Sequence, residues 1–305
     1  MLNPTKPYVI GSPVRRKIGG DRRSDIIKQN SIVPEPIDRN QFQIQKESRE
    51  FYFQSPVLVW INTYNRPNEL KSLLSDIYEN RANFKIKVFI FDDGSQVDYS
   101  SALHRFAGKL EIVYHRMTTN HGKRLYWKLC NYALSVIKEE APYHRYFVKI
   151  DDDCRLVKDF FLKCANIWES INDKKKICLN FRLDTREGRA VWTGFIPRTH
   201  RFDHISVYLS QWVDMDFFCE ASMLEALNYQ IREQFLRRWT FNKAASSGVG
   251  RDISIRLTKA GYRLYLTTET LVNHDHHDSK MNPEERGRNP LVTKPIINLK
   301  YGLPL

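Results

Sequence analysis

The stretch "YFVKIDDDCRLVKDFF", residues 146–161, sets three consecutive aspartates directly behind a short apolar run. The run "YFVKI" (146–150) is typical of a buried strand, and "VKDFFLKCANIW" (157–168) predicts a helix after it. Adjacent ionised carboxylates repel one another, so a cluster of them is favourable chiefly where a cation neutralises it. The sequence therefore predicts a cation site at the end of a strand. The alternative is that the aspartates cap the helix, with its start near Leu156.

Two further strands precede this stretch, and each is followed by a helical pattern. "PVLVWI" (56–61) and "KIKVFIF" (85–91) are short apolar runs typical of buried strands. Apolar residues then recur at helical spacing, first at Leu70, Leu73, Leu74, Ile77 and Tyr78, and later at Leu125, Leu129, Tyr132, Ala133, Val136 and Ile137. Alternating strands and helices predict an α/β fold with a parallel sheet covered on both faces. Ligands of such sheets bind beyond the carboxyl ends of the strands, where we expect the loops 62–68, 92–96 and 151–155.

The second half of the chain is less regular. Three segments predict strands, namely "KICLNFRL" (176–183), "AVWTGFI" (190–196) and "ISVYLSQWVDMDFF" (205–218). "RDISIRLTKAGYRLYL" (251–266) predicts a helix, a C-cap at Gly261 and a strand. Residues 1–50 are polar and basic without a sustained period, which predicts an N-terminal extension before a folded domain at 51–280. Residues 281–305 are expected to form a C-terminal tail.

The composition favours a soluble globular protein. Hydrophobic residues make up 42% and aromatic residues 12% of the 305 residues, which excludes wholesale disorder. The five cysteines form no C-x-x-C pair and are odd in number, which argues against a disulfide framework or a cysteine zinc site. The N-terminus has no signal-type apolar region, and no stretch approaches the ~20 apolar residues that span a bilayer. We therefore expect a cytoplasmic protein.

Positive charge is in excess and unevenly distributed. The formal net charge is +13. Residues 104–128 hold six basic residues against one acidic residue, and residues 228–263 hold eight against two. This excess favours a polyanionic partner or an anionic membrane surface. The alternative is a pair of solvated helix faces.

The chemistry of the aspartates and of one basic turn favours a metal-bound diphosphate. Hard oxygen ligands favour Mg²⁺ or Mn²⁺ over zinc, and Mg²⁺ is commonly held by one or two carboxylates together with substrate phosphates. Gly122, Lys123 and Arg124 open a predicted helix, where backbone N–H groups and cationic side chains can bind phosphate. For this turn, the alternative is an ordinary surface turn before a helix.

Five ordered segments resemble the motif set of family-2 glycosyltransferases over roughly residues 56–275: "VLVWINTYNRP", "VFIFDDGS", "NHGKRLYWKLCNYAL", "VKIDDD" and "RDISIRLTKAGYRL". The resemblance implies a GT-A, Rossmann-like fold with a mostly parallel central sheet flanked by helices. The nucleotide-sugar half would be 51–155, and a less regular acceptor half would be 156–280. It also implies a metal-dependent, inverting hexosyl- or pentosyltransferase. The donor would be a nucleotide-diphosphate sugar, and we expect a UDP-sugar.

The resemblance and the basic turn together predict the donor site, which is expected to include Thr63, Tyr64, Arg66, Asp93, Gly122, Lys123, Asp151 and Asp152. By the resemblance, Asp93 would lie near the base and Asp152 near the ribose. Residues 151–153 would form the D-x-D element, with Asp153 and Asp151 binding Mn²⁺ or Mg²⁺. His274 would add an imidazole ligand to the same ion. Its alternative is a polar surface loop, because residues 274–278 read "HDHHD".

The family's general base is missing from its expected place. The family carries a Glu-Asp pair just before the aspartate that opens the helix, and Val249 and Gly250 stand there in this sequence. Asp252 is the first candidate, because an inverting transfer needs a group that accepts the proton of the attacking hydroxyl. Asp252 is alternatively the N-cap of a helix at 253–260. The other candidate bases are Asp214, Asp216 and Glu220.

For the acceptor we expect DNA, because positive charge clusters outside the donor site. Such an activity is similar to that of phage-encoded transferases that glycosylate hydroxymethylated bases, which would place the protein in the host cytoplasm. A flipped base would enter near residues 214–252 while the phosphates are held by Arg237, Arg238, Lys243 and Arg251. The alternatives are a transferase that builds surface polysaccharide or glycolipid, and a catalytically silent protein that binds the nucleotide sugar.

Overall fold

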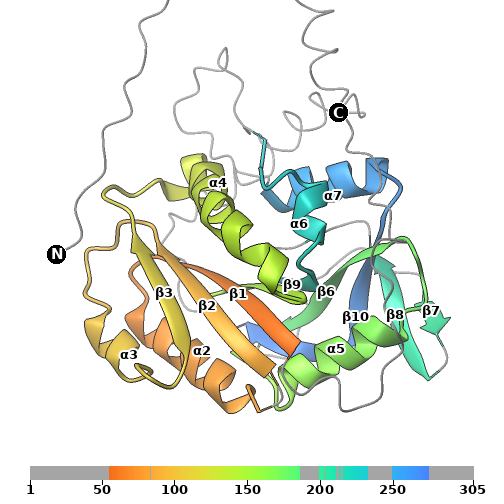
Figure 1. The fold of residues 1–305 in the computed structure, drawn as a ribbon, viewed down its shortest axis with the longest axis horizontal. Coiled ribbons are helices and arrows are strands. Elements are labelled where there is room, and N and C mark those ends of the chain that lie inside the picture. Colours follow the sequence, from red (N-terminus) through yellow and green to blue (C-terminus); the bar gives the residue numbers. More distant parts are fainter. Residues whose placement is uncertain are drawn as a thin grey trace, which may run out of the picture. The chain divides into compact units, whose positions relative to one another are not determined.

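The computed structural model describes residues 55–82, 84–185, 199–202, 204–210, 213, 216–232 and 249–274. The ten strands in this part of the chain form a single sheet, in the order β3-β2-β1-β4-β9-β6-β10-β8-β7, and β5 pairs with β10 (Figure 1). Three predicted elements lie outside the described residues: the extension at 1–50, the strand at 190–196 and the tail at 281–305.

The first half of the sheet is parallel and follows the apolar runs of the sequence. Its strands are β1 (Ser55–Thr63), β2 (Phe84–Asp92), β3 (Glu111–Arg116) and β4 (Tyr146–Asp151). All three adjoining pairs are parallel. The connecting helices are α2 (Pro67–Glu79), the short α3 (Ser100–His104) and α4 (Gly122–Glu140), which a 3-10 turn at Ala141–Tyr143 follows. The strands and helices predicted for this half are confirmed, and β3 and α3 are additional.

The second half of the sheet mixes strand directions. β9 (Phe217–Glu220) lies antiparallel between β4 and β6 (Lys176–Thr185). β10 (Arg263–His274) runs parallel to β6, and β8 (Ile205–Ser210) and β7 (Thr199–Phe202) continue antiparallel beyond it. The predicted strand at 205–218 is therefore two strands in separate places in the sheet. The expected fold class is confirmed, because the parallel half is joined to a less regular one.

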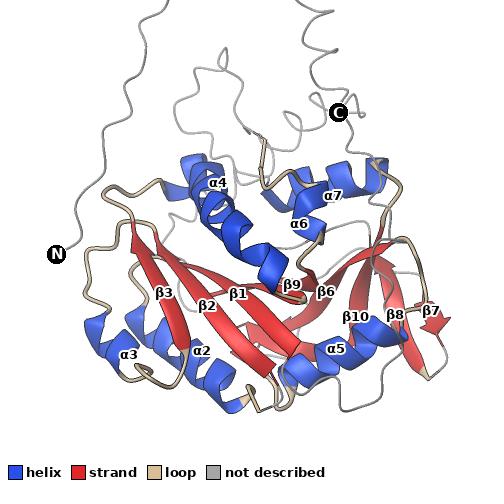
Figure 2. Cartoon of the chain, viewed as in Figure 1, coloured by secondary structure: helices blue, strands red, loops and turns tan. Residues whose placement is uncertain are grey.

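Helices cover both faces of the sheet. α4, α6 (Met223–Ala226) and α7 (Val249–Lys259) lie on one face, and α2, α3 and α5 (Phe160–Ser170) lie on the other (Figure 2). Strands buried from both sides need apolar side chains on both sides, and residues 57–61 of β1 are each at most 2% exposed. None of the helices described is long and apolar enough to span a membrane.

The alternative that Asp151, Asp152 and Asp153 cap a helix starting near Leu156 is wrong. Cys154–Leu156 form strand β5, which pairs antiparallel with the end of β10. Helix α5 begins only at Phe160, after Asp159 in a left-handed backbone conformation (φ 61°). The aspartates thus lie at the end of β4 and in the turn before β5. The expected boundary between the nucleotide-sugar half and the acceptor half, after residue 155, falls inside β5. Strands from both sides of this boundary belong to the same sheet.

Candidate active site

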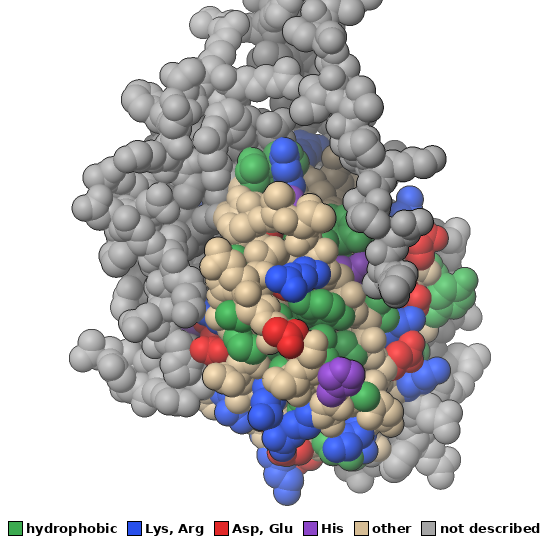
Figure 3. Space-filling view, turned by 90° about the vertical axis from the view of Figure 1, so that its left-hand side faces the viewer, with side chains coloured by type: hydrophobic (Ala, Val, Ile, Leu, Met, Phe, Trp, Pro, Cys, Tyr) green, Lys and Arg blue, Asp and Glu red, His purple; other side chains and the backbone are tan. Residues whose placement is uncertain are grey.

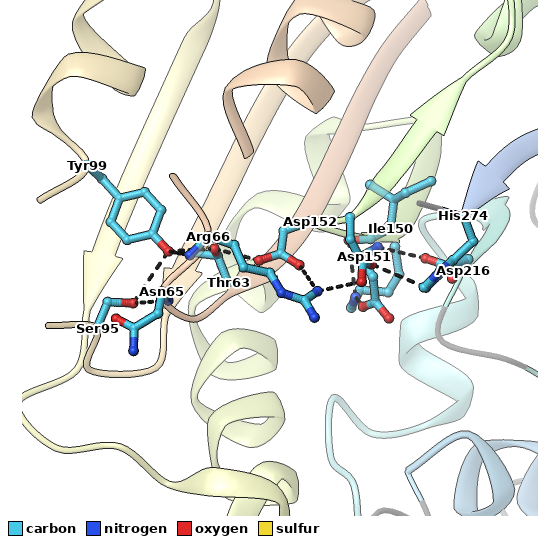
Figure 4. A network of polar contacts seen from close by, with 12 residues as sticks. Thr63, Asn65, Arg66, Ser95, Tyr99, Ile150, Asp151, Asp152, Asp216 and His274 are labelled. Carbon is cyan, nitrogen blue, oxygen red and sulfur yellow. Dashed lines mark hydrogen bonds and ion pairs between the residues drawn. The ribbon is translucent and has the colours of Figure 1, made fainter. Parts of the chain in front are cut away.

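Loops from three parallel strands begin at the same edge of the sheet, as the sequence predicted. The register pairs Thr63 at the end of β1 with Asp92 at the end of β2, and Asn62 with Asp151 at the end of β4. Figure 4 shows side chains of the β1 and β4 loops turned toward one another across this edge. The candidate site is built here.

Asp152 is buried against the loop that follows β1. Thr63 Oγ1 donates a hydrogen bond to Asp152 Oδ2 (2.7 Å), and Arg66 Nη1 donates one to Asp152 Oδ1 (3.1 Å). Burial raises the pKa of Asp152 to about 7, and the nearby guanidinium of Arg66 opposes that shift. Three of the predicted donor residues therefore lie in direct contact.

Tyr99, which the sequence did not single out, holds the β1 loop in place. Its hydroxyl lies 2.9 Å from Thr63 Oγ1 and accepts a hydrogen bond from the backbone N–H of Arg66 (2.9 Å). The backbone N–H of Asn65 donates to Ser95 Oγ (2.8 Å) in the neighbouring loop. Tyr64, a predicted donor residue, is partly exposed on this fixed loop. No sequence signal marked Tyr99, because a tyrosine in a loop is common.

Asp153 contacts two residues that lie far apart in the sequence, Arg66 and His274. Its Oδ2 accepts a hydrogen bond from Arg66 Nη1 (2.5 Å), and its Oδ1 lies 3.2 Å from His274 Nε2. His274 reaches this point because β10 ends beside β5, where the register pairs His274 with Cys154. The structure therefore brings together two of the predicted metal ligands, 121 residues apart in sequence.

The residues at this point fit a divalent metal ion. Asp153, Cys154 and His274 each offer one ligand atom, and the three atoms lie within 4.8 Å of one another. Carboxylate oxygen and imidazole nitrogen are both ligands that Mn²⁺ accepts. Asp151, the other predicted ligand, is not in this cluster.

Asp151 instead pairs with a buried lysine. Lys149 Nζ donates a hydrogen bond to Asp151 Oδ1 (2.7 Å), and the Lys149 side chain has no exposed surface. Asp216, directly before β9, accepts a hydrogen bond from the backbone N–H of Asp151 (2.7 Å). Burial alone would lower the pKa of Lys149, but Asp151 and Asp216 raise it above its usual value. In the sequence, Lys149 could have been noticed as the one charged residue of the apolar run 146–150.

The Asp93 side chain binds the backbone at the start of α4. Its carboxylate accepts hydrogen bonds from the backbone N–H groups of His121 (3.0 Å) and Gly122 (3.1 Å) and from Asn120 Nδ2 (3.0 Å). His121 Nδ1 is also 2.7 Å from Asp93 Oδ1. The helix start that was expected to bind phosphate thus carries a carboxylate of the same chain. The Lys123 side chain lies outside the described part, so its role and that of Gly122 stay predictions.

Gly94 is required by the turn that carries Asp93. Its backbone is left-handed (φ 73°), and a Cβ there would meet Thr119 C at 2.7 Å. We expect Gly94→Ala to lower the free energy of unfolding, measured in urea, by more than the about 1–2 kcal/mol that a left-handed alanine costs. Gly108→Ala is the matched control, because Gly108 has φ 72° and open space around it. Equal losses in the two variants would contradict a close contact at Gly94.

The candidate bases lie in different surroundings. Asp252 is not an N-cap, because α7 already begins at Val249, and its side chain is almost fully buried beside Arg256 Nη1 (3.4 Å). Asp216 is also buried, but it lies at the carboxyl edge beside Asp151. Asp214 lies outside the described residues. The assignment of a base therefore stays a prediction.

The expected nucleic-acid contacts fall mostly outside the described part of the chain, which omits Arg237, Arg238 and Lys243. Arg251 lies on α7, where partial burial lowers its pKa. In the first basic segment, Arg105 and Lys109 are exposed. Figure 3 shows Lys and Arg side chains gathered at the lower end of one face. This arrangement agrees with a solvated basic surface and identifies no partner.

Comparison with known proteins places the fold. No family model matches the chain. A segment of 102 residues, 32% of the chain, is 28% identical to hyaluronan synthase from Pasteurella multocida and spans 10% of that protein.

The chain also superimposes on TarS from S. aureus with a TM-score of 0.56 at 15% identity, over 80% of this chain and 39% of that one. A structure of TarS 1–349 in complex with UDP-GlcNAc gives a TM-score of 0.57 at 14% identity, again over 80% of this chain and over 65% of that one. The chain has a GT-A-like fold. It spans less than two thirds of the length of each of these proteins.

Proposed function

We propose that this protein is a glycosyltransferase that moves a sugar from a UDP-sugar, with the help of a divalent metal ion, to an acceptor hydroxyl. The observation that carries the proposal is the meeting of Asp153 and His274 beside Asp152 and Arg66 at the carboxyl edge of the parallel strands. In open α/β sheets this edge is where ligands bind. The similarity to hyaluronan synthase and to a structure bound to UDP-GlcNAc supports the same donor class.

The residues of the site divide the work of such a transfer. Asp153 and His274 would hold the metal, which when bound offsets the negative charge that develops on the leaving diphosphate. Thr63 and Asp152 would line the nucleotide pocket in fixed positions, because Tyr99 holds the β1 loop. Lys149 pairs with Asp151 from inside the sheet. Asp151 therefore needs no metal ion to offset its charge and can face the donor.

For the base we favour Asp216 over Asp252. A general base must come within hydrogen-bonding reach of the acceptor hydroxyl near the donor. Asp216 lies next to Asp151 at the carboxyl edge, whereas Asp252 is tied to Arg256 and to the backbone N–H of Arg232 (3.3 Å). Asp216 also accepts a hydrogen bond, from the backbone N–H of Asp151, so the choice rests on its position at the carboxyl edge.

The proposal is tested by incubating the protein with Mn²⁺ and a panel of sugar nucleotides and measuring the release of nucleoside diphosphate. We expect slow release of UDP from a UDP-sugar, which EDTA abolishes and added Mn²⁺ restores. The metal dependence follows from the ligand set of Asp153 and His274. Absence of both turnover and Mn²⁺-dependent UDP binding would instead favour a protein that keeps the fold without the reaction.

The acceptor is a separate part of the proposal. DNA remains our proposal on the basis of net charge +13, and a glycan acceptor is the second candidate because of the match to hyaluronan synthase. Adding duplex DNA with hydroxymethylated bases or an oligosaccharide to the same assay separates the two. Mass spectrometry shows which one gains a sugar. A DNA acceptor also requires binding that weakens as salt is raised.

A further inference from the structure

One sulfur atom lies in the candidate metal site. The ligand atoms of Asp153, Cys154 and His274 lie within 4.8 Å of one another, and this is the one such group of three found among the described residues. Cys154 has no exposed surface, and Asp153 and His274 are largely buried. A carboxylate and an imidazole account for a site for Mn²⁺, whereas a thiol has no place in a site of hard ligands.

The fold holds this sulfur in place. Cys154 begins β5, and the antiparallel register with β10 sets it opposite His274. Asp153 precedes Cys154 directly, and its Oδ1 faces His274 Nε2 while its Oδ2 is bound by Arg66. Two of the three groups therefore lie on paired strands, and the third is in the turn that enters one of them. Such a site closes around an ion with small side-chain movements.

The three groups match the preference of a borderline or soft metal ion. Zn²⁺ binds thiolate, imidazole and carboxylate together, and three protein ligands leave a position open for another molecule. Soft thiolate ligands favour such ions over Mg²⁺ and Mn²⁺. On binding, the S–H bond of Cys154 would break, a metal–sulfur bond would form, and the proton would pass to the buffer.

We propose that Cys154 is a metal ligand that makes this site bind Zn²⁺ or Cd²⁺ more tightly than Mn²⁺, so that these ions displace the ion that supports transfer. The displacement rests on the proposed function, whereas the binding of Cd²⁺ by Cys154 does not. Zn²⁺ would thus act as an inhibitor at the donor site. The same residues would therefore hold Mn²⁺ for the reaction and bind Zn²⁺ or Cd²⁺ as inhibitors.

The test is a titration of the full chain with Cd²⁺, followed through the ultraviolet thiolate-to-cadmium charge-transfer band. We expect the band in the wild-type protein and its loss in Cys154→Ser. Cys164→Ser is the matched control, because Cys164 is also a free, fully buried cysteine but lies in α5. This variant should keep the band. Cys154→Ala serves as a second variant should the serine disturb folding, which circular dichroism reports.

A competition experiment adds the link to the reaction. Zn²⁺ should release bound Mn²⁺, seen as the free-ion signal in electron paramagnetic resonance, at a roughly tenfold lower concentration in wild type than in Cys154→Ala. A band that persists in both Cys154 variants, or no band in wild type, would overturn the inference. A band without any UDP-sugar cleavage in Mn²⁺ would leave Cys154 as a ligand and remove the proposed function instead.

Discussion

Asp153→Asn is expected to lower Mn²⁺-supported release of UDP from a UDP-sugar by roughly 100- to 1,000-fold, the range seen when one electrostatic stabiliser of a transition state is removed. Asparagine has nearly the same shape, but it lacks the charge that a divalent ion needs. Asp153 faces both Arg66 and His274, so its loss removes the group on which the proposed metal site is centred. The measurement is the initial rate of UDP release at saturating donor.

The control for this experiment is Asp98→Asn. Asp98 is an exposed aspartate that accepts hydrogen bonds from Ser100 at the start of α3. Its replacement should leave the rate near that of wild type. A full rate in Asp153→Asn, with Mn²⁺ still required, would mean that the metal is held elsewhere. Equal Mn²⁺ affinity in both variants would argue the same.

Lys149→Met is expected to lower the free energy of unfolding by about 3 kcal/mol, the lower end of the range for breaking a buried ion pair. The lower end applies because the Asp151 side chain is 35% exposed and keeps some contact with water. Methionine fills much of the volume of lysine, but it leaves Asp151 and Asp216 without their internal cation. Urea denaturation followed by fluorescence measures the loss.

Two further variants identify the cause. Lys176 is also buried and lies over a tryptophan ring, as Lys149 does, and it donates a hydrogen bond to the backbone carbonyl of Trp168. We expect a smaller loss for Lys176→Met, because this contact leaves a neutral carbonyl rather than a carboxylate behind. The double variant Lys149→Met with Asp151→Asn removes both charges and should recover part of the stability. Simple addition of the two single losses would show that Lys149 and Asp151 are not coupled.

The parallel half of the fold could be predicted because local pattern decides it. Buried strands of a covered sheet must be apolar on both faces, so the runs at 56–61, 85–91 and 146–150 could be recognised without knowing their partners. The loops that follow them then had to meet at one edge. The contact of Thr63 with Asp152 is a result of this rule, since β1 and β4 are neighbours.

The second half could not be predicted in the same way because its order depends on distant pairing. Nothing in the run 205–218 marks the break that sends β8 and β9 to different places in the sheet. The position of Cys154 in a short strand also depends on β10, more than 100 residues later. The sequence predicted a loop at 151–155 and a helix at 157–168, because a strand of three residues is too short to show a pattern of its own.

Arg66 gives the site a property that follows from its position between two carboxylates. One guanidinium nitrogen contacts both Asp152 and Asp153, so the protein carries a resident cation at the point where a divalent ion would bind. In the proposed reaction, metal binding would exchange one positive group for another, because Arg66 already offsets the charge of both carboxylates. The displaced guanidinium would then be available to the phosphates of the donor.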